Sequence, residues 1–222
     1  MKKNNHSTIS FTKRKETKVL TIYGWLLLII LILSFFFLFI IKIHPFLATY
    51  RPIDADILVV EGWLPDITIE RASKEFNYQD YLFLITTGGL ISNGAYFIED
   101  STFAELSAST LKKFGLKEDL IIKIPFHGMR QDLSYVSALA LKRWLLESDL
   151  NIKSLNILSL GSDSRRSWLV YKRVLGKEIS VGIIPSENPY YDPENWWKSI
   201  NGVRTVLGDA FGYLFTFFFF NP

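Results

Sequence analysis

The chain has 222 residues, of which 49% are hydrophobic and none is cysteine. This length is sufficient for one membrane anchor and one globular domain of ordinary size. With no cysteine and only three histidines, a zinc site built from several Cys or His ligands is excluded. Residues 1–42 contain seven basic residues and one acidic residue, whereas the rest of the chain is acidic overall. The net charge of +3 therefore comes from the N-terminal tail, and we do not expect nucleic acid as a partner.

Residues 22–41 form an apolar stretch without a charged residue. A helix of this length is ~30 Å long, which matches the hydrocarbon core of a bilayer. A signal peptide is the rival interpretation, but its apolar part is usually about 7–15 residues and precedes a small-residue cleavage site, which this flank lacks. We therefore expect a single transmembrane helix. The basic tail, residues 1–21, predicts a cytoplasmic N-terminus, so the connector (42–53) and the domain (54–222) should lie outside the inner or cell membrane.

Within the domain, short apolar runs alternate with amphipathic segments. Five runs have the length and content of buried strands, and they cover residues 56–60, 81–85, 120–125, 157–160 and 179–184. Four helices are predicted between them: residues 68–76 capped by Asp66, residues 102–114, residues 135–147 capped by Ser134, and a helix that begins at residues 162–164 and stops at Gly176. The aromatic C-terminal segment contains 11 apolar residues, 210–220, too few to span a bilayer. We expect it to pack on the domain or to rest at the membrane surface.

Polar residues and glycines follow the first two strands. Glu61 and Gly62 come directly after residues 56–60, and a carboxylate beside a glycine at the end of a strand is a candidate site. Thr87, Gly88 and Gly89 follow the second strand, where the glycines let the backbone approach a ligand closely or adopt positive φ. This pattern is neither a dinucleotide-binding fingerprint nor a phosphate loop with lysine.

Further candidates follow the third and fourth strands. Arg130 and Asp132 lie after the third strand. Asp163 precedes Arg165 and Arg166, which stand in the first turn of the next helix, where the helix dipole disfavours cations. Such a pair indicates an anion nearby, because backbone N–H groups and guanidinium groups then converge on one charge. In the alternative interpretation, both arginines reach water or neighbouring carboxylates.

One candidate has an equally good structural explanation. Glu105 stands three residues after Thr102, which is the spacing of a capping box at the start of a helix. Both interpretations of Glu105, as a capping residue and as a ligand-binding residue, remain open.

The alternation of strands and helices predicts an α/β fold, a Rossmann-like three-layer sandwich with a mostly parallel five-stranded sheet. In such sheets ligands bind beyond the carboxyl ends of the strands, where all of these polar groups would meet. This convergence favours a ligand-binding role for the arginine pair. The predicted ligand-binding residues are Glu61, Gly62, Thr87, Gly88, Gly89, Glu105, Arg130, Asp132, Asp163, Arg165 and Arg166.

The order of the motifs resembles the membrane-anchored SanA, ElyC and YdcF group, a domain-of-unknown-function family. The resemblance covers roughly residues 54–217 and rests on ILVVEGW, TTGG, AEL, RQDLSYVSALAL and LGSDSRRS followed by VLG. It implies a Rossmann-like fold and a role in the bacterial cell envelope. The chain departs from the family at Asp163, where many members have histidine, and at Leu133 and Ser137, where many have threonine and asparagine. One branch is linked to S-adenosylmethionine, which we do not expect to reach a domain outside the cytoplasm.

Three functions remain open at this point. The first is a module that binds an anionic small molecule or a lipid-linked precursor at the arginine pair. The second is a hydrolase or transferase acting on a phosphate-bearing envelope precursor, with Glu61 or Asp163 as the catalytic base. The third is a non-catalytic partner in a membrane complex. The scarcity of paired catalytic groups favours the first, since an arginine beside a carboxylate stabilises a fixed ion pair rather than a proton shuttle. The sequence identifies no cofactor and no metal site.

Overall fold

The computed structural model describes residues 20–91, 102–126 and 132–222, and the chain divides into two units, residues 1–39 and residues 40–222. Helix α1, Ile22–Leu47, begins in the first unit and ends in the second. In the described part of the chain it is the one helix long and apolar enough to cross a membrane, a test that a signal sequence near the N-terminus would also pass. The helix continues to Leu47, so it includes part of the expected connector.

The second unit is built on a five-stranded sheet in which every pair of strands is parallel, with the order β3-β2-β1-β4-β5. This arrangement confirms the predicted α/β fold. Each predicted run forms a strand, although the second begins two residues later than expected and the fourth begins three residues earlier. The strands are β1 (Ile57–Glu61), β2 (Phe83–Gly88), β3 (Ile121–Pro125), β4 (Ser154–Leu160) and β5 (Ser180–Ser186).

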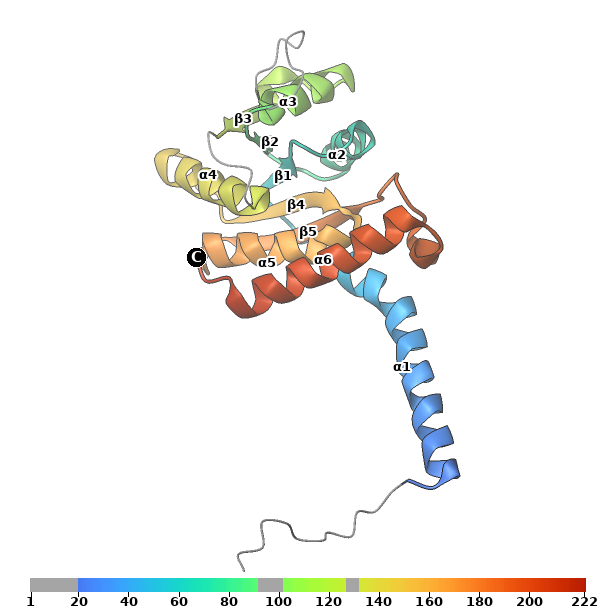
Figure 1. The fold of residues 1–222 in the computed structure, drawn as a ribbon. Coiled ribbons are helices and arrows are strands. Elements are labelled where there is room, and N and C mark those ends of the chain that lie inside the picture. Colours follow the sequence, from blue (N-terminus) through green and yellow to red (C-terminus); the bar gives the residue numbers. More distant parts are fainter. Residues whose placement is uncertain (1–19, 92–101, 127–131) are drawn as a thin grey trace, which may run out of the picture. The chain divides into compact units, whose positions relative to one another are not determined.

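Helices cover both faces of the sheet (Figure 1). On one face, α2 (Asp66–Tyr78) and α3 (Phe103–Lys113) pack on a core that includes Leu58 and Val60 of β1. On the other face, α4 (Leu133–Glu147) and α5 (Ser164–Leu175) pack on a core that includes Ile57 and Val59. This division follows from the alternation of side chains along a strand. Short 3-10 helices cover Glu118–Leu120, Gly161–Asp163 and Pro193–Lys198.

Two of the expected helix caps are wrong. Pro65, not Asp66, occupies the N-cap of α2 and makes no side-chain capping bond. Asp132, not Ser134, caps α4, where its side chain accepts the Tyr135 N–H and its φ of 52° is left-handed. Asp132 can adopt this conformation because aspartate and asparagine tolerate left-handed φ better than most residues. The cap therefore fixes the Asp132 carboxylate at the start of α4.

The C-terminal segment forms one long helix, α6 (Ile200–Phe219), which packs outside α5 (Figure 1). Val206 and Ala210 are buried against Leu47 at the end of α1, inside the second unit. At its other end α6 is held by Arg173 of α5, whose guanidinium donates to the carbonyls of Thr216, Phe217 and Phe220. The tail is thus part of the domain, and one face of α6 remains outside.

Candidate functional site

The strand order creates a crevice between β1 and β4. The chain leaves β1 towards β2 and β3 on one side of the sheet, and from β3 it crosses to β4 on the other side of β1. Ligands of open parallel sheets bind at this switch point. A pocket of about 390 Å³ lies there, and the charged residues that line it are Asp163, Arg166 and Asp209. Trp63, Leu64 and Leu160 contribute apolar wall to the same pocket.

Arg166 lies at the centre of a small ion-pair network. Its Nε and Nη2 donate to the Asp163 carboxylate at 2.7 and 3.2 Å, and its Nη1 donates to Asp132 Oδ1 at 3.1 Å. Burial alone would lower the pKa of Arg166, but the two carboxylates outweigh burial and raise this pKa above its ordinary value. The guanidinium is therefore permanently charged and held in one orientation, with further N–H groups beyond those three bonds.

Arg165 is directed elsewhere. Its Nε donates to the carbonyl of Phe46 and its Nη2 donates to Thr49 Oγ1 at 3.2 Å. The guanidinium also lies over the Phe46 ring, 3.9 Å from the ring centroid. Arg165 does not line the pocket at the switch point and instead binds Phe46 in the last turn of α1 and Thr49 directly after that helix. The structure thus separates the two arginines that the sequence grouped together.

Glu61 is buried behind the pocket at the carboxyl end of β1, with 1% of its surface exposed. Burial, followed by the nearby charge of Asp163, raises the pKa of Glu61 from 4.5 to about 7, although Ser134, Arg166 and Ser159 act in the opposite direction. Near neutral pH this carboxyl therefore carries a proton about half of the time. Such a group can store or exchange a proton if water reaches it.

Hydroxyl groups surround Glu61 on the α4 and α5 side of the sheet. Ser159 lies 3.4 Å from Glu61 Oε2, and Ser167 lies 3.4 Å from both Glu61 oxygens. Side chains alternate between the two faces of the sheet along a strand, and Ser159 of β4 lies on the same face as Glu61 of β1. These O···O distances are long for O–H···O hydrogen bonds, which are usually 2.5–3.0 Å. The carboxyl is therefore weakly stabilised by its neighbours, consistent with its raised pKa.

A second group of hydroxyls adjoins the first. In the described part of the chain, the buried hydroxyls of Thr87, Ser137 and Tyr171 make no hydrogen bond. Burial and the charge of Glu61 raise the pKa of Tyr171 well above 10, while Thr87 and Ser137 lie close enough to oppose that rise. Thr87 is the register partner of Glu61 in the sheet, so the structure brings these two predicted residues together.

Asp209 of α6 is a pocket residue that the sequence interpretation missed. It accepts a hydrogen bond of 2.5 Å from Ser162, whose hydroxyl also lies 3.1 Å from that of Tyr191. The Tyr191 hydroxyl in turn lies 3.1 Å from His44 Nε2. Burial and the charge of Asp163 raise the pKa of Asp209 from 3.8 to about 6. The signal in the sequence for a functional role of Asp209 was that it is a single acidic residue within the apolar segment that forms α6.

The glycines and Glu105 have structural roles. A Cβ atom at Gly62 would lie 2.5 Å from the Phe103 carbonyl oxygen, and one at Gly88 would lie 2.6 Å from the Ala104 nitrogen, so both allow the start of α3 to approach the sheet. A Cβ atom at Gly89 would meet the Phe126 ring at 2.9 Å. The predicted capping box is confirmed, because the Glu105 carboxylate accepts from the Thr102 backbone and hydroxyl. Arg130 lies outside the described residues.

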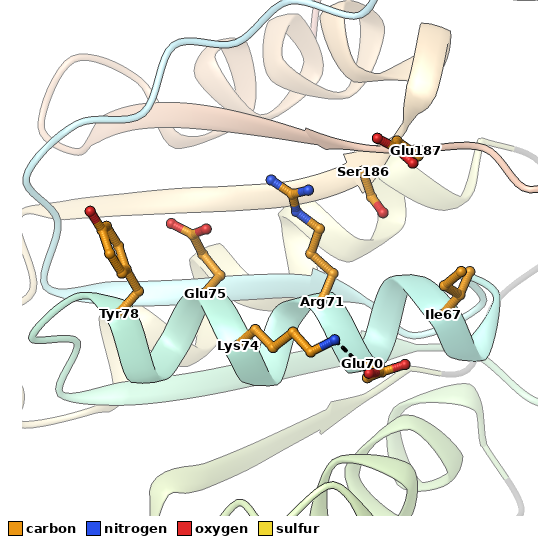
Figure 2. Close-up of a pocket in the computed structure, with 8 residues that line it drawn as sticks. All are labelled: Ile67, Glu70, Arg71, Lys74, Glu75, Tyr78, Ser186 and Glu187. Carbon is orange, nitrogen blue, oxygen red and sulfur yellow. Dashed lines mark ion pairs between the residues drawn. The ribbon is translucent and has the colours of Figure 1, made fainter. Parts of the chain in front are cut away.

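A separate hollow of about 500 Å³ runs along the outer side of α2 (Figure 2). It is lined by charged side chains, and Lys74 and Glu70 pair with each other across 2.6 Å. Figure 2 shows Arg71 directed towards Ser186 at the end of β5. None of the predicted ligand-binding residues lines this hollow. We therefore place the candidate site in the smaller pocket at the switch point.

Neither a protein-family model nor a curated protein matches this chain. The geometry and electrostatics of the pocket are therefore the basis for inferring its function.

Proposed function

We propose that this chain is a membrane-anchored protein that binds a small polar molecule in the pocket at the carboxyl edge of its sheet. The observation that carries the proposal is that Asp163, Arg166 and Asp209 line one pocket at the switch point between β1 and β4. The helix α1 supports the anchor by its length and composition. The order of motifs that resembles the SanA, ElyC and YdcF group supports a role in the cell envelope.

The charges restrict the chemistry of the ligand. The bonds from Arg166 to Asp163 and Asp132 leave part of the guanidinium for an anionic group of the ligand. Asp163 and Asp209 would repel any anionic group, but they would also accept hydrogen bonds from hydroxyl or amino groups, which a sugar phosphate supplies beside its phosphate. A volume of about 390 Å³ is at the small end of the range for ligand pockets, roughly 300–1,000 Å³. We therefore favour a sugar phosphate or the polar head of a lipid-linked precursor.

The first test of this proposal uses the full chain in lipid nanodiscs and measures thermal unfolding. The panel contains inorganic phosphate, sugar phosphates, nucleotides, S-adenosylmethionine and a short-chain polyprenyl phosphate sugar. A ligand at 100 times its dissociation constant stabilises by ~2.7 kcal/mol, which raises the melting temperature by several degrees. We expect Arg166→Ala to abolish that shift, because Arg166 lines the pocket.

Arg165→Ala is the matched control. It removes the same charge from the neighbouring position, but the Arg165 side chain points away from the pocket. Each variant is compared with its own ligand-free melting temperature. A shift that survives in Arg166→Ala, or that is lost equally in both variants, would contradict the proposed site.

A hydrolase or transferase is the second candidate. The observation that favours it is the pKa of Asp209, raised to about 6 in the pocket lining, since a general acid or base works best with a pKa near the operating pH. Asp209 is better placed for this role than Glu61, which is buried, or Asp163, which is paired with Arg166. Turnover of the bound ligand, lost in Asp209→Asn while binding persists, would identify the protein as an enzyme.

The proposed orientation places the pocket outside the cytoplasm, because the basic residues precede α1. We expect a reporter that is active only outside the cytoplasm to be active when it is fused after Pro222. A green fluorescent protein fused at the same point, exported in the unfolded state, should remain dark. The opposite pattern would place the domain in the cytoplasm. Cytoplasmic nucleotides and S-adenosylmethionine would then be candidate ligands.

A further inference from the structure

Helix α6 exposes a continuous apolar face. Phe211, Phe215 and Phe218 are 71%, 65% and 69% exposed, and their spacing of three and four residues places them on one side of the helix. Ile200, Leu214 and Phe219 extend this surface, which we call the phenylalanine face. Exposed apolar patches of this kind mark contacts with a membrane or another macromolecule.

The charges of α6 are distributed unevenly around the helix. The helix contains two charged residues, Arg204 and Asp209. Asp209 points into the domain, where it accepts from Ser162. Arg204 is exposed and falls on the side of the phenylalanine face, seven residues before Phe211. The phenylalanine face therefore carries one basic residue and no acidic residue, and a basic residue at a membrane surface is attracted to anionic lipid headgroups.

The opposite side of α6 is anchored to the end of α1. Within residues 40–222, Val206 and Ala210 pack with Leu47, and Ile40 and Ile43 join the same cluster. Trp196, in the 3-10 helix that precedes α6, donates its indole N–H to the Ile40 carbonyl at 3.1 Å. The helix with the phenylalanine face is therefore fixed to residues 40–47, which include the end of the expected transmembrane stretch, 22–41, and the residues directly after it.

Helix geometry gives the distance of this attachment from the end of the expected transmembrane stretch. From residue 41 to Leu47, α1 rises by ~9 Å at 1.5 Å per residue. The interfacial region of a bilayer occupies roughly 5–8 Å on each side of the hydrocarbon core. If α1 spans the bilayer as we propose, residues 42–47 cross the headgroup region, and the α6 residues packed on Leu47 lie at its outer edge.

We infer that α6 is a second membrane contact, in which the phenylalanine face inserts into the interface of a bilayer that contains anionic lipid. This inference rests on the membrane-anchoring part of the proposed function and is independent of the ligand. Its consequence is that the domain is held against the membrane by two attachments, α1 and α6. Asp209 would connect the lipid contact to the pocket, because it lies on the same helix.

The natural absence of cysteine allows a direct test with the full chain. Single cysteines at Phe215, at Ile29 in α1 and at Tyr78 in α2 are labelled with an environment-sensitive fluorophore, and each protein is reconstituted into phosphatidylcholine and phosphatidylglycerol vesicles. Quenching is measured with lipids brominated on the acyl chains and with aqueous iodide. We expect the label at Phe215 to lose emission with brominated lipid, as the label at Ile29 does. The label at Tyr78, a residue 85% exposed on α2, should respond only to iodide.

The other outcomes are distinguishable. A label at Phe215 that responds to iodide and not to brominated lipid would overturn the inference. A label shielded from both quenchers would show that a second copy or another protein covers this face, which also overturns it. If brominated lipid quenches Phe215 but not Ile29, the membrane contact of α6 stands and the transmembrane anchor fails. Ligand binding by the same preparations reports separately on the pocket.

Discussion

Replacing Glu61 with glutamine will stabilise the folded domain at pH 8 by about 3 kcal/mol and will reduce the decline of its stability between pH 4.5 and 7. The magnitude follows from a pKa raised from 4.5 to about 7, at roughly 1.4 kcal/mol per pH unit. Glutamine has nearly the same shape as glutamate but does not ionise. The variant therefore avoids the free energy that the wild-type protein loses when the buried carboxyl ionises.

The direction of the pH dependence follows from proton binding. Below pH 4.5 Glu61 is protonated in both the folded and the unfolded state, so burial carries no penalty from ionisation. Between pH 4.5 and about 7 the folded state retains a proton that the unfolded state has lost, and stability falls as the pH rises. Above about pH 7 both states are ionised and the loss is complete. Asp209 adds a decline of the same sign and similar size, between pH 3.8 and about 6.

The measurement is urea unfolding of the full chain in detergent micelles, followed by tryptophan fluorescence from pH 4 to 8. Glu118→Gln is the matched control, because the Glu118 side chain is 71% exposed and its substitution should leave the curve unchanged. Asp209→Asn should remove the part of the decline that lies at lower pH. Parallel stability curves for wild type and Glu61→Gln would show that Glu61 does not hold a proton as the structure requires.

Replacing Gly62 with alanine will destabilise the domain by about 3 kcal/mol, at the upper end of the usual cost of overpacking a core. The new Cβ atom would lie 2.5 Å from the Phe103 carbonyl oxygen and 2.7 Å from the Thr87 carbonyl oxygen. Both are backbone atoms, so no side-chain rotation relieves the contact. The chain would have to move the start of α3 away from the ends of β1 and β2.

Gly208→Ala is the matched control for this change. Gly208 is exposed in α6, and a Cβ atom added there would meet nothing within 4 Å. Since alanine is favoured over glycine in a helix by up to ~1 kcal/mol, this variant should be as stable as wild type or slightly more so. Both variants are measured by urea unfolding at one pH. Equal stability of Gly62→Ala and wild type would refute the packing explanation of Gly62.

Local patterns in the sequence predicted most of the fold. Hydrophobic runs and their spacing identified the five strands, because burial of apolar side chains dominates the choice of secondary structure. Thr102 with Glu105 and the stop at Gly176 were correct because caps depend on residues close in sequence. The two caps predicted incorrectly, at Asp66 and Ser134, lie one and two residues after the observed N-caps, because the first residue of a helix is set by its backbone conformation and not by residue type alone.

The sequence by itself determined the parallel sheet, the apolar α1 and the convergence of Glu61, Asp163 and Arg166 at one edge. Only the tertiary structure decided which arginine faces the pocket. Arg165 and Arg166 are adjacent, and a rotation of ~100° per residue separates two neighbours onto different sides of a helix. Asp209 could not be assigned from sequence, because its place in the pocket depends on how α6 packs against α5, more than 30 residues earlier in the chain. Its raised pKa has the same origin, since burial is a property of the packed molecule and not of the residue.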